Sequence, residues 1–402
     1  MKPTVQSNIH IKQEDTGLSV LQVLPSLETG GGGVERTTID IAEAIVNSGA
    51  NAFVASEGGQ MVKELLEYGA NHITLPLASK NPLTMRNNVK RLVNTIRQNN
   101  ISIVHARSRA PAWSALSASR ICKCNFLTTF HGTYNYGNGV SGKIKKYYNS
   151  VMTKGEIIIA NSEFIAKHIT NEYGISEKNI RIVPRGIDLD IFNTQKVTEE
   201  KILHLKKLWC LDEKTIKILL PGRLTNWKGQ SLLINALYEL KKNIGTENFN
   251  MMGLLVGSDQ GRSSYKKKLE QQIISLGMEN HLKILGHCSD MPTAYTLADI
   301  VVSASTDPEA FGRVVAEAQA MGKPVIVANH GGGIEQVIPE KTGWLFRPGD
   351  PISLSETLKQ VIDIENHNKS KLSNIAINHV KKFYSKANMC SATLDIYAEL
   401  RK

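Results

Sequence analysis

Short apolar runs alternate with longer amphipathic segments along most of the chain. In the first half, strand-like runs occur at 18–25, 51–56, 101–106, 126–132 and 156–162. Between them lie helix-like segments such as 88–100, in which apolar residues recur at the spacing of one helix face. Several of the strand-like runs are apolar throughout, which indicates burial on both faces. Strands that alternate with helices predict a parallel sheet covered by helices.

The alternation pauses at 183–200, which is rich in turn-forming residues, and then restarts. Further strand-like runs occur at 216–222, 249–257, 281–286, 299–305, 324–328 and 343–350. The length of 402 residues also favours two domains. We therefore predict two Rossmann-like, doubly wound α/β domains that face each other across a cleft, with ligands at the carboxyl ends of the strands.

The predicted boundaries follow the same pattern. We expect a flexible tail over 1–17, an N-terminal domain over 18–195 and a C-terminal domain over 196–384. The last helix, about 385–402, is a candidate to pack back on the first domain.

Composition narrows the class of protein. No apolar run approaches the roughly 18 residues that a membrane span needs. The polar N-terminus lacks the apolar core of a secretory signal, and the five cysteines follow no metal or disulfide pattern. We therefore expect a cytoplasmic protein without a bound metal.

The net charge of +11 is unevenly distributed. No acidic residue lies between Glu67 and Glu156, whereas 13 lysines and arginines do. A basic region of this size usually faces an anionic partner, such as a membrane surface, a phosphorylated or carboxylated acceptor, or nucleic acid. The alternative is that these residues merely solvate helix faces.

Two strand ends carry features suited to anions. The first strand leads into four glycines, 30–33, which allow close backbone approach before a helix N-terminus. In the second half, Arg223 and Lys228 flank a strand-to-helix turn, and two fixed cations there suit a diphosphate. The alternatives are a plain flexible turn for the glycines and ordinary surface charge for the cations.

Two glutamates, Glu309 and Glu317, bracket the start of a predicted helix that runs from about Phe311 to Met321. Eight helical residues rise roughly 12 Å, which is too far for two carboxylates to share a proton. The spacing suits two grips on one long ligand, such as a nucleoside diphosphate sugar, with the helix N-terminus near the diphosphate. The alternative is a dipole-favoured Glu309 and a solvated Glu317.

The segment 308–326, PEAFGRVVAEAQAMGKPVI, closely resembles the glutamate signature of the retaining glycosyltransferases of family 4, which have the GT-B fold. The glycine-rich turn, the Arg223 and Lys228 pair and the hinge sequence VPRGID also match that family. Arg185 stands where the hinge usually has Asn, and the glycine run is longer than the usual pair. The likeness spans about 18–400 and is strongest to alphaproteobacterial lipopolysaccharide-core mannosyltransferases.

The resemblance implies roles for single residues. Glu309 would hold the donor sugar and Glu317 the ribose, while Arg223 and Lys228 would neutralise the diphosphate. Backbone groups at Phe311, Gly312, Gly32 and Gly33 would also contact the donor, and His131 matches the active-site histidine of the family. The family retains the anomeric configuration, and with fixed cations at the leaving group we expect no metal cofactor.

The first domain is the expected acceptor side. Arg107 and Arg109 follow a strand end and are candidates to bind acceptor carboxylates or phosphates. The basic segment 141–154, with Lys143, Lys145 and Lys146, suits an anionic membrane surface. An anionic lipid-linked acceptor of the lipid A–Kdo type at the cytoplasmic leaflet of the inner membrane would explain both features.

The sequence therefore predicts a peripheral-membrane, retaining glycosyltransferase that moves mannose from GDP-mannose to the lipopolysaccharide inner core. The same chemistry with a UDP-sugar donor is the main alternative. A nucleotide-sugar epimerase is disfavoured, because it would need no basic face toward a membrane. A nucleic-acid-binding protein would leave Glu309 and Glu317 unexplained, and no recognition motif for nucleic acid is present.

Overall fold

The computed structural model describes residues 17–28, 33–134, 136–137, 139–364 and 366–401. The chain forms two compact units. The first contains residues up to Asn161, Ile165–Val183 and Cys390–Lys402, and the second contains Ser162–Phe164 and Pro184–Met389. The main division lies within the predicted pause, upstream of the expected boundary at residue 195. Of the predicted tail over 1–17, residues 1–16 lie outside the described residues.

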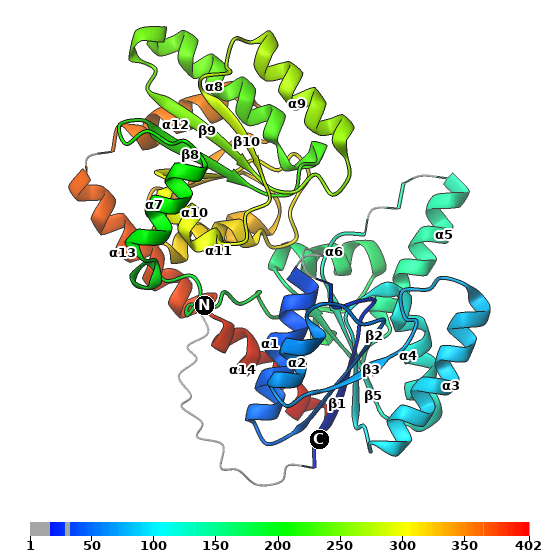
Figure 1. Cartoon of the computed structure of the whole chain (residues 1–402). Coiled ribbons are helices and arrows are strands. Elements are labelled where there is room, and N and C mark those ends of the chain that lie inside the picture. Colours follow the sequence, from blue (N-terminus) through cyan, green and yellow to red (C-terminus); the bar gives the residue numbers. More distant parts are fainter. Residues whose placement is uncertain (1–16, 29–32, 135, 138, 365, 402) are drawn as a thin grey trace. The chain divides into compact units, whose positions relative to one another are not determined.

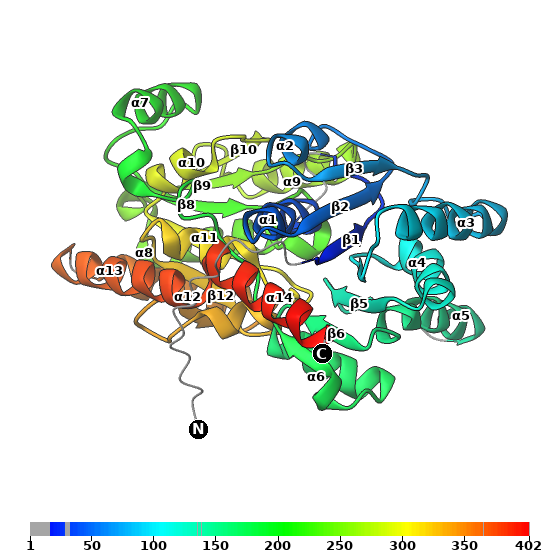
Figure 2. The same ribbon diagram turned by 90° about the horizontal axis from the view of Figure 1, so that it is seen from below.

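The first unit is built on a seven-stranded parallel sheet in the order β3-β2-β1-β4-β5-β6-β7 (Figure 1). Figure 2 shows β3, β2 and β1 side by side from another direction. The strands are β1 Ser19–Val23, β2 Asn51–Ser56, β3 Asn71–Thr74, β4 Ile103–Ala106, β5 Asn125–Phe130, β6 Ile157–Ala160 and β7 Ile180–Ile182. The helices are α1 Gly33–Asn47, α2 Val62–Glu67, α3 Pro82–Gln98, α4 Arg109–Cys122, α5 Gly139–Asn149 and α6 Glu163–Tyr173.

The second unit is built on a six-stranded parallel sheet in the order β10-β9-β8-β11-β12-β13. Its strands are β8 Ile216–Pro221, β9 Met251–Val256, β10 Leu282–Gly286, β11 Ile300–Ser303, β12 Val325–Ala328 and β13 Trp344–Phe346. Its helices are α7 Glu199–Leu208, α8 Gln230–Ile244, α9 Ser263–Ser275, α10 Met291–Leu297, α11 Arg313–Ala320, α12 Pro351–Ile362 and α13 Asn366–Phe383. The prediction of two parallel, helix-covered α/β units is confirmed.

The last helix, α14 Lys386–Leu400, is shared between the units by its contacts. Its C-terminal part belongs to the first unit, where the Tyr397 hydroxyl lies 2.8 Å from His105 Nδ1. The other ring nitrogen of His105 lies 2.6 Å from Thr129 Oγ1. All three side chains are buried, so this network satisfies polar groups inside the core of the first unit.

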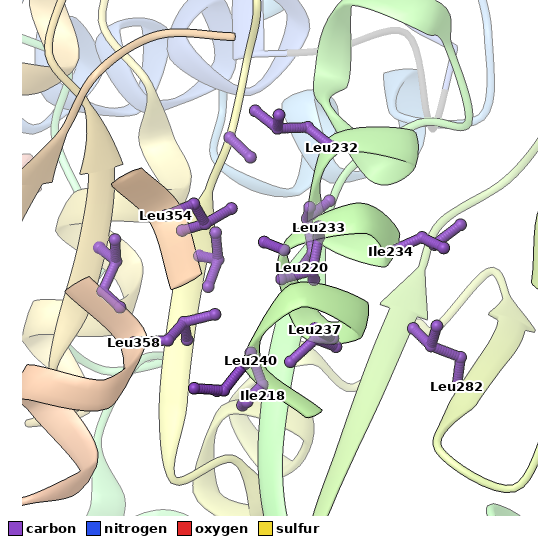
Figure 3. Close-up of a cluster of buried hydrophobic side chains, with 14 of the residues drawn as sticks. Ile218, Leu220, Leu232, Leu233, Ile234, Leu237, Leu240, Leu282, Leu354 and Leu358 are labelled. Atoms are coloured by element: carbon purple, nitrogen blue, oxygen red, sulfur yellow. The ribbon is translucent and has the colours of Figure 1, made fainter. Parts of the chain in front are cut away.

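The core of the second unit forms on both faces of its sheet because strand side chains alternate in direction. Ile218 and Leu220 of β8 pack with helices α8 and α12, whereas Leu219 between them packs with α10 and α11. Figure 3 shows Leu233, Leu237 and Leu240 of α8 in the first of these clusters, together with leucines of α12. Burial on both faces is the physical reason that the strand sequence is apolar throughout.

Short side chains fix where the helices of the second unit begin. Asp290 precedes α10 and accepts a hydrogen bond from Thr293 N at 3.2 Å. Asp350 precedes α12 and accepts from Ile352 N and Ser353 N at 2.9 and 3.1 Å. Both helices have proline in their first turn, where its missing N–H is not needed. The helix starts are therefore encoded locally.

Substituting Leu237 with alanine should destabilise the second unit by about 2–5 kcal/mol, because a fully buried leucine of the α8 cluster would leave a cavity. Chemical denaturation would measure the change. Leu203→Ala on α7 is the matched control, because that leucine is 55% exposed and its loss should stay within about 0.5 kcal/mol. Equal effects of the two substitutions would contradict this placement of the core.

Candidate functional site

The candidate site lies at the point where the strand order of the second sheet reverses. Strand β8 pairs with β9 on one side and with β11 on the other, so the connections leaving β8 and β11 diverge. Ligands of open α/β sheets bind at such a point, beyond the carboxyl ends of the strands. The loop after β8 carries Arg223 and Lys228, and the loop after β11 carries Glu309. The topology therefore brings together residues that are about 80 positions apart.

Glycines allow these loops to lie close together. Gly229, at a φ of 79°, has so little room that a Cβ would lie 2.6 Å from the carbonyl carbon of Ala304. A Cβ on Gly257 would lie 2.6 Å from the carbonyl carbon of Gly222. The backbone itself thus fills the space where side chains would separate the strand ends.

Lys228 and Glu309 form an ion pair in which the lysine ammonium donates to Glu309 Oε1. Ser305 Oγ donates to the same oxygen at 2.6 Å. The two charged side chains are 15% and 18% exposed, and the Lys228 ammonium lies 4.4 Å from the centroid of the Trp227 ring. Because both charges are largely withdrawn from water, each depends on the other for its stabilisation.

A second glycine-rich turn packs against the loop that carries Glu309. Gly332 N donates to Glu309 O at 2.7 Å, and a Cβ on Gly331 would lie 2.6 Å from that oxygen. Gln336 Nε2 donates to the carbonyl oxygens of Phe311 and Gly312. The sequence prediction missed this support, although three consecutive glycines after a strand repeat the signal that it used at 30–33.

The helix after this loop starts later than predicted. Helix α11 begins at Arg313, after Gly312 at a φ of 81°, and ends at Ala320, within the predicted range of about 311–321. Phe311 is buried, with its ring 5.8 Å from that of Tyr384. Since the first N–H groups of a helix lack intrahelical partners, the backbone at Gly312 and Arg313 can bind an anion.

Glu317 has partners of its own, separate from those of Glu309. Its Oε2 accepts from the hydroxyl of Tyr295 at 2.8 Å, and its Oε1 accepts from Arg313 Nε at 3.1 Å. The side chain is 13% exposed. The interpretation of two distinct carboxylate sites is consistent with these contacts, which link each glutamate to different residues.

Arg223 is exposed on the loop after β8, and its carbonyl oxygen accepts from Gln230 Nε2 at 2.9 Å. This contact ties the loop to the start of α8. Lys228 and Glu309 are therefore brought into direct contact, whereas the Arg223 side chain remains available to a ligand.

In the first unit, Tyr134 links two of the predicted residues. Its hydroxyl accepts from His131 N at 3.4 Å, and its ring centroid lies 4.4 Å from the Arg109 guanidinium. Arg109 also donates to Asn149 Oδ1 at 2.8 Å. His131 follows β5 directly, so both residues lie near carboxyl ends of strands in this unit. Gly33 begins α1, and Gly32 lies outside the described residues.

Arg107 departs from the expectation of a side chain open to an acceptor. It is 1% exposed, and its backbone N–H donates to Val23 O at 3.0 Å. Burial lowers the pKa of Arg107 to about 10, against the opposing influence of Tyr397, Cys390 and Asp40. This side chain lies in the interior of the unit, so it is not open to an acceptor in this structure.

Helix α5 carries the three predicted membrane lysines. Lys143 and Lys145 are exposed, whereas Lys146 is partly covered and lies 3.6 Å from Glu172. Val140, Ile144 and Tyr147, at helical spacing, are 76%, 65% and 69% exposed. An exposed apolar row between lysines is unusual for a helix that faces only water.

Two features are absent from the described part of the chain. None of the helices described there combines the length and apolar character needed to cross a membrane. Over the same residues, no group of three or more histidine, cysteine, aspartate or glutamate side chains is arranged to hold a metal ion.

Comparison with known proteins assigns the family. Residues 31–191 match Glycosyltransferase Family 4, and residues 205–379 match Glycosyl transferases group 1. A glycosyltransferase from Rickettsia africae ESF-5 is 36% identical, with a TM-score of 0.87 over 96% of this chain and 99% of that chain. The chain therefore belongs to the glycosyltransferases of family 4 and group 1.

Two further relatives share less of the sequence with this chain. The structure of Anabaena Alr3699/HepE in complex with UDP-glucose is 24% identical, with a TM-score of 0.79 over 95% of this chain and 100% of that one. D-inositol 3-phosphate glycosyltransferase from Corynebacterium diphtheriae is 24% identical over 58% of this chain. The chain spans about half of that enzyme's length, 54%.

Substituting Gly229 with alanine should lower the stability of the second unit by about 2–5 kcal/mol, from the left-handed backbone and the clash with Ala304 together. Chemical denaturation would measure it. Gly277→Ala is the control, because its φ is 62° but a Cβ there would meet open space, so only the backbone cost of about 1 kcal/mol should appear. A Gly229 variant no less stable than the Gly277 variant would show that the two loops are not in contact.

Proposed function

We propose that the chain is a glycosyltransferase whose second unit binds a nucleotide-sugar donor. The observation that carries the proposal is the contact of Lys228 with Glu309 at the strand-order reversal, beside the N-terminus of α11. A cation, a carboxylate and unpaired peptide N–H groups are what a diphosphate and a sugar require within a short distance. Family membership adds independent support.

In this proposal, donor binding reorganises the ion pair. The diphosphate takes the Lys228 ammonium as its partner, which frees one lone pair of Glu309 for hydroxyls of the sugar. Ser305 continues to hold the carboxylate in place. Arg223 adds a second cation from the exposed side of the loop. As the glycosidic bond to phosphate breaks, these cations and the helix N-terminus stabilise the negative charge that develops on the leaving diphosphate.

At the far end of the donor, Glu317 accepts hydrogen bonds from the ribose hydroxyls. The family motif marks His131 of the first unit as a further active-site residue, and the backbone at Phe311 and Gly312 contacts sugar and phosphate. We further propose that transfer retains the anomeric configuration and needs no metal ion. Support for these roles comes from the motifs that match the family and from position, because His131 and the loop at 311–312 follow strands and Glu317 lies on α11.

The donor proposed is GDP-mannose and the acceptor a Kdo–lipid A type precursor of the lipopolysaccharide inner core. The motif likeness to lipopolysaccharide-core mannosyltransferases supports this choice. A UDP-sugar is the alternative donor, favoured by the structural likeness to HepE, whose structures contain UDP or UDP-glucose. The two donors share the diphosphate and ribose that the residues above would hold.

A donor screen tests the proposal. GDP-mannose, UDP-glucose and UDP-GlcNAc are each incubated with the protein in the presence of EDTA, and nucleotide release is measured. We expect release from GDP-mannose with EDTA present, because fixed cations rather than a metal neutralise the leaving group. Loss of all activity with EDTA would contradict metal independence, and activity with a UDP-sugar alone would transfer the proposal to the alternative donor.

The role of Glu309 is tested in the same assay with Glu309→Gln, which keeps the size of the side chain but removes its charge. Turnover should fall by about 100-fold or more if the carboxylate holds the sugar at the reacting carbon. A Glu309→Gln protein with turnover near that of the unaltered chain would rule out this role for the residue.

We also propose that the protein is cytoplasmic and binds peripherally to the inner membrane through α5. The apolar row of Val140, Ile144 and Tyr147 would enter the headgroup region, with Lys143 and Lys145 beside anionic lipids. Lys146 adds charge although Glu172 partly neutralises it. Arg109, held by Asn149, lies on the acceptor side of this unit as a candidate for acceptor phosphates.

Replacing Lys143, Lys145 and Lys146 with glutamine should weaken binding to vesicles that contain anionic lipid by about tenfold or more, since each basic residue contributes about 1 kcal/mol near such a surface. Co-sedimentation measures the binding. The matched control replaces Lys266, Lys267 and Lys268 of α9, another run of three lysines, and should leave it unchanged. Equal binding by both triple variants and the unaltered chain would refute a membrane role for α5.

A further inference from the structure

Tyr295 is a fully buried tyrosine that contacts Glu317, and the motifs of the family assign no role to it. Tyr295 lies on α10, has no exposed surface and belongs to the same apolar cluster as Val315 and Ala316 of α11. Its ring centroid lies 6.1 Å from that of Phe192. The ring is therefore held on several sides, and the position of its hydroxyl is fixed by packing.

The direction of the hydrogen bond between Tyr295 and Glu317 follows from chemistry. An ionised carboxylate can only accept, so the hydroxyl donates to Oε2 at 2.8 Å. Burial, together with the neighbouring Glu317 carboxylate, raises the pKa of Tyr295 well above its usual value, so the hydroxyl keeps its proton. This donor is therefore permanent over the pH range in which enzymes work.

The two donors to Glu317 differ in what they fix. Arg313 Nε reaches Oε1 at 3.1 Å from one turn earlier on the same helix, so it moves with α11 and is partly exposed. Tyr295 comes from a different helix and reaches the other oxygen. Of the two donors, only Tyr295 connects the Glu317 carboxylate to a second element. This contact sets the rotation of the carboxylate relative to the sheet.

The lone pairs that remain define what Glu317 can still bind. A carboxylate has about four acceptor positions, of which Tyr295 and Arg313 use one on each oxygen. One acceptor position is left on each oxygen, side by side. Two neighbouring hydroxyl donors match this pair, and the 2′- and 3′-hydroxyls of a ribose are such a pair.

We propose that Tyr295 is a positioning residue that orients the Glu317 carboxylate toward both ribose hydroxyls, and that this orientation sets the discrimination between ribose and 2′-deoxyribose. The inference rests on the proposed function, in which Glu317 holds the ribose. Without the tyrosine hydroxyl, the carboxylate can turn, and one ribose hydroxyl loses its acceptor.

The experiment measures dissociation constants by calorimetry for GDP and UDP and for their 2′-deoxy counterparts. The unaltered chain should bind the ribonucleotide that it prefers about tenfold or more tightly than the deoxy form, the usual contribution of one hydrogen bond to a charged group. Tyr295→Phe keeps the packed ring and should lower this ratio at least about threefold, since the carboxylate is then less well oriented.

Two variants serve as references. Glu317→Ala should abolish the discrimination altogether. Tyr384→Phe is the matched control, because this buried tyrosine of the same unit donates its hydroxyl to the Glu335 carbonyl at 2.9 Å rather than to Glu317. This variant should be less stable, as expected when the hydroxyl of a buried tyrosine is removed. Its affinity ratio for the ribonucleotide over the 2′-deoxyribonucleotide should equal that of the unaltered chain.

The outcomes separate this inference from the function on which it rests. A ratio unchanged in Tyr295→Phe but lost in Glu317→Ala would overturn the role of Tyr295 and leave the ribose contact standing. A ratio unchanged in Glu317→Ala would overturn the ribose contact and the inference with it. Arg313→Gln removes the donor that lies on the same helix as Glu317, so it should lower the ratio less than Tyr295→Phe does. An equal or larger fall in Arg313→Gln would count against orientation of the carboxylate by Tyr295.

Discussion

The site of the second unit depends on the close approach of two backbone segments, the loop after β8 and the loop after β11. Gly229 lies against Ala304 with no room for a side chain, and this contact places Lys228 beside Glu309. A partly buried ion pair is stable only when both charges have partners. The glycines that permit the approach are therefore as important to the site as the charged residues themselves.

The same physical requirement explains how the other polar groups near the site are arranged. Glu309 is held by Ser305, Glu317 by Tyr295, and the turn between them by Gln336, which donates to Phe311 and Gly312. Each carboxylate thus accepts from one neutral hydroxyl in addition to the cation with which it pairs, Lys228 or Arg313.

The first unit uses buried polar groups differently. His105, Thr129 and Tyr397 satisfy one another in its core, where burial lowers the pKa of His105 well below its usual value and keeps the ring neutral. Arg107 lies in the same interior with a lowered pKa. The basic character of this unit is instead presented by exposed residues such as Lys143 and Lys145 on α5, beside an apolar row. The basic residues that form one region of the sequence are thus divided between the core and the surface of this unit.

The sequence by itself determined the class of fold and the residues at the strand ends, because apolar periodicity and glycine turns are local properties of the chain. The spacing of Glu309 and Glu317 also predicted two separate carboxylate sites, and the structure gives the two side chains different partners. Only the tertiary structure decided that Lys228 pairs with Glu309, that Tyr295 holds Glu317 and that Arg107 faces inward. Each of these depends on how segments distant in the chain pack together, which no local pattern specifies.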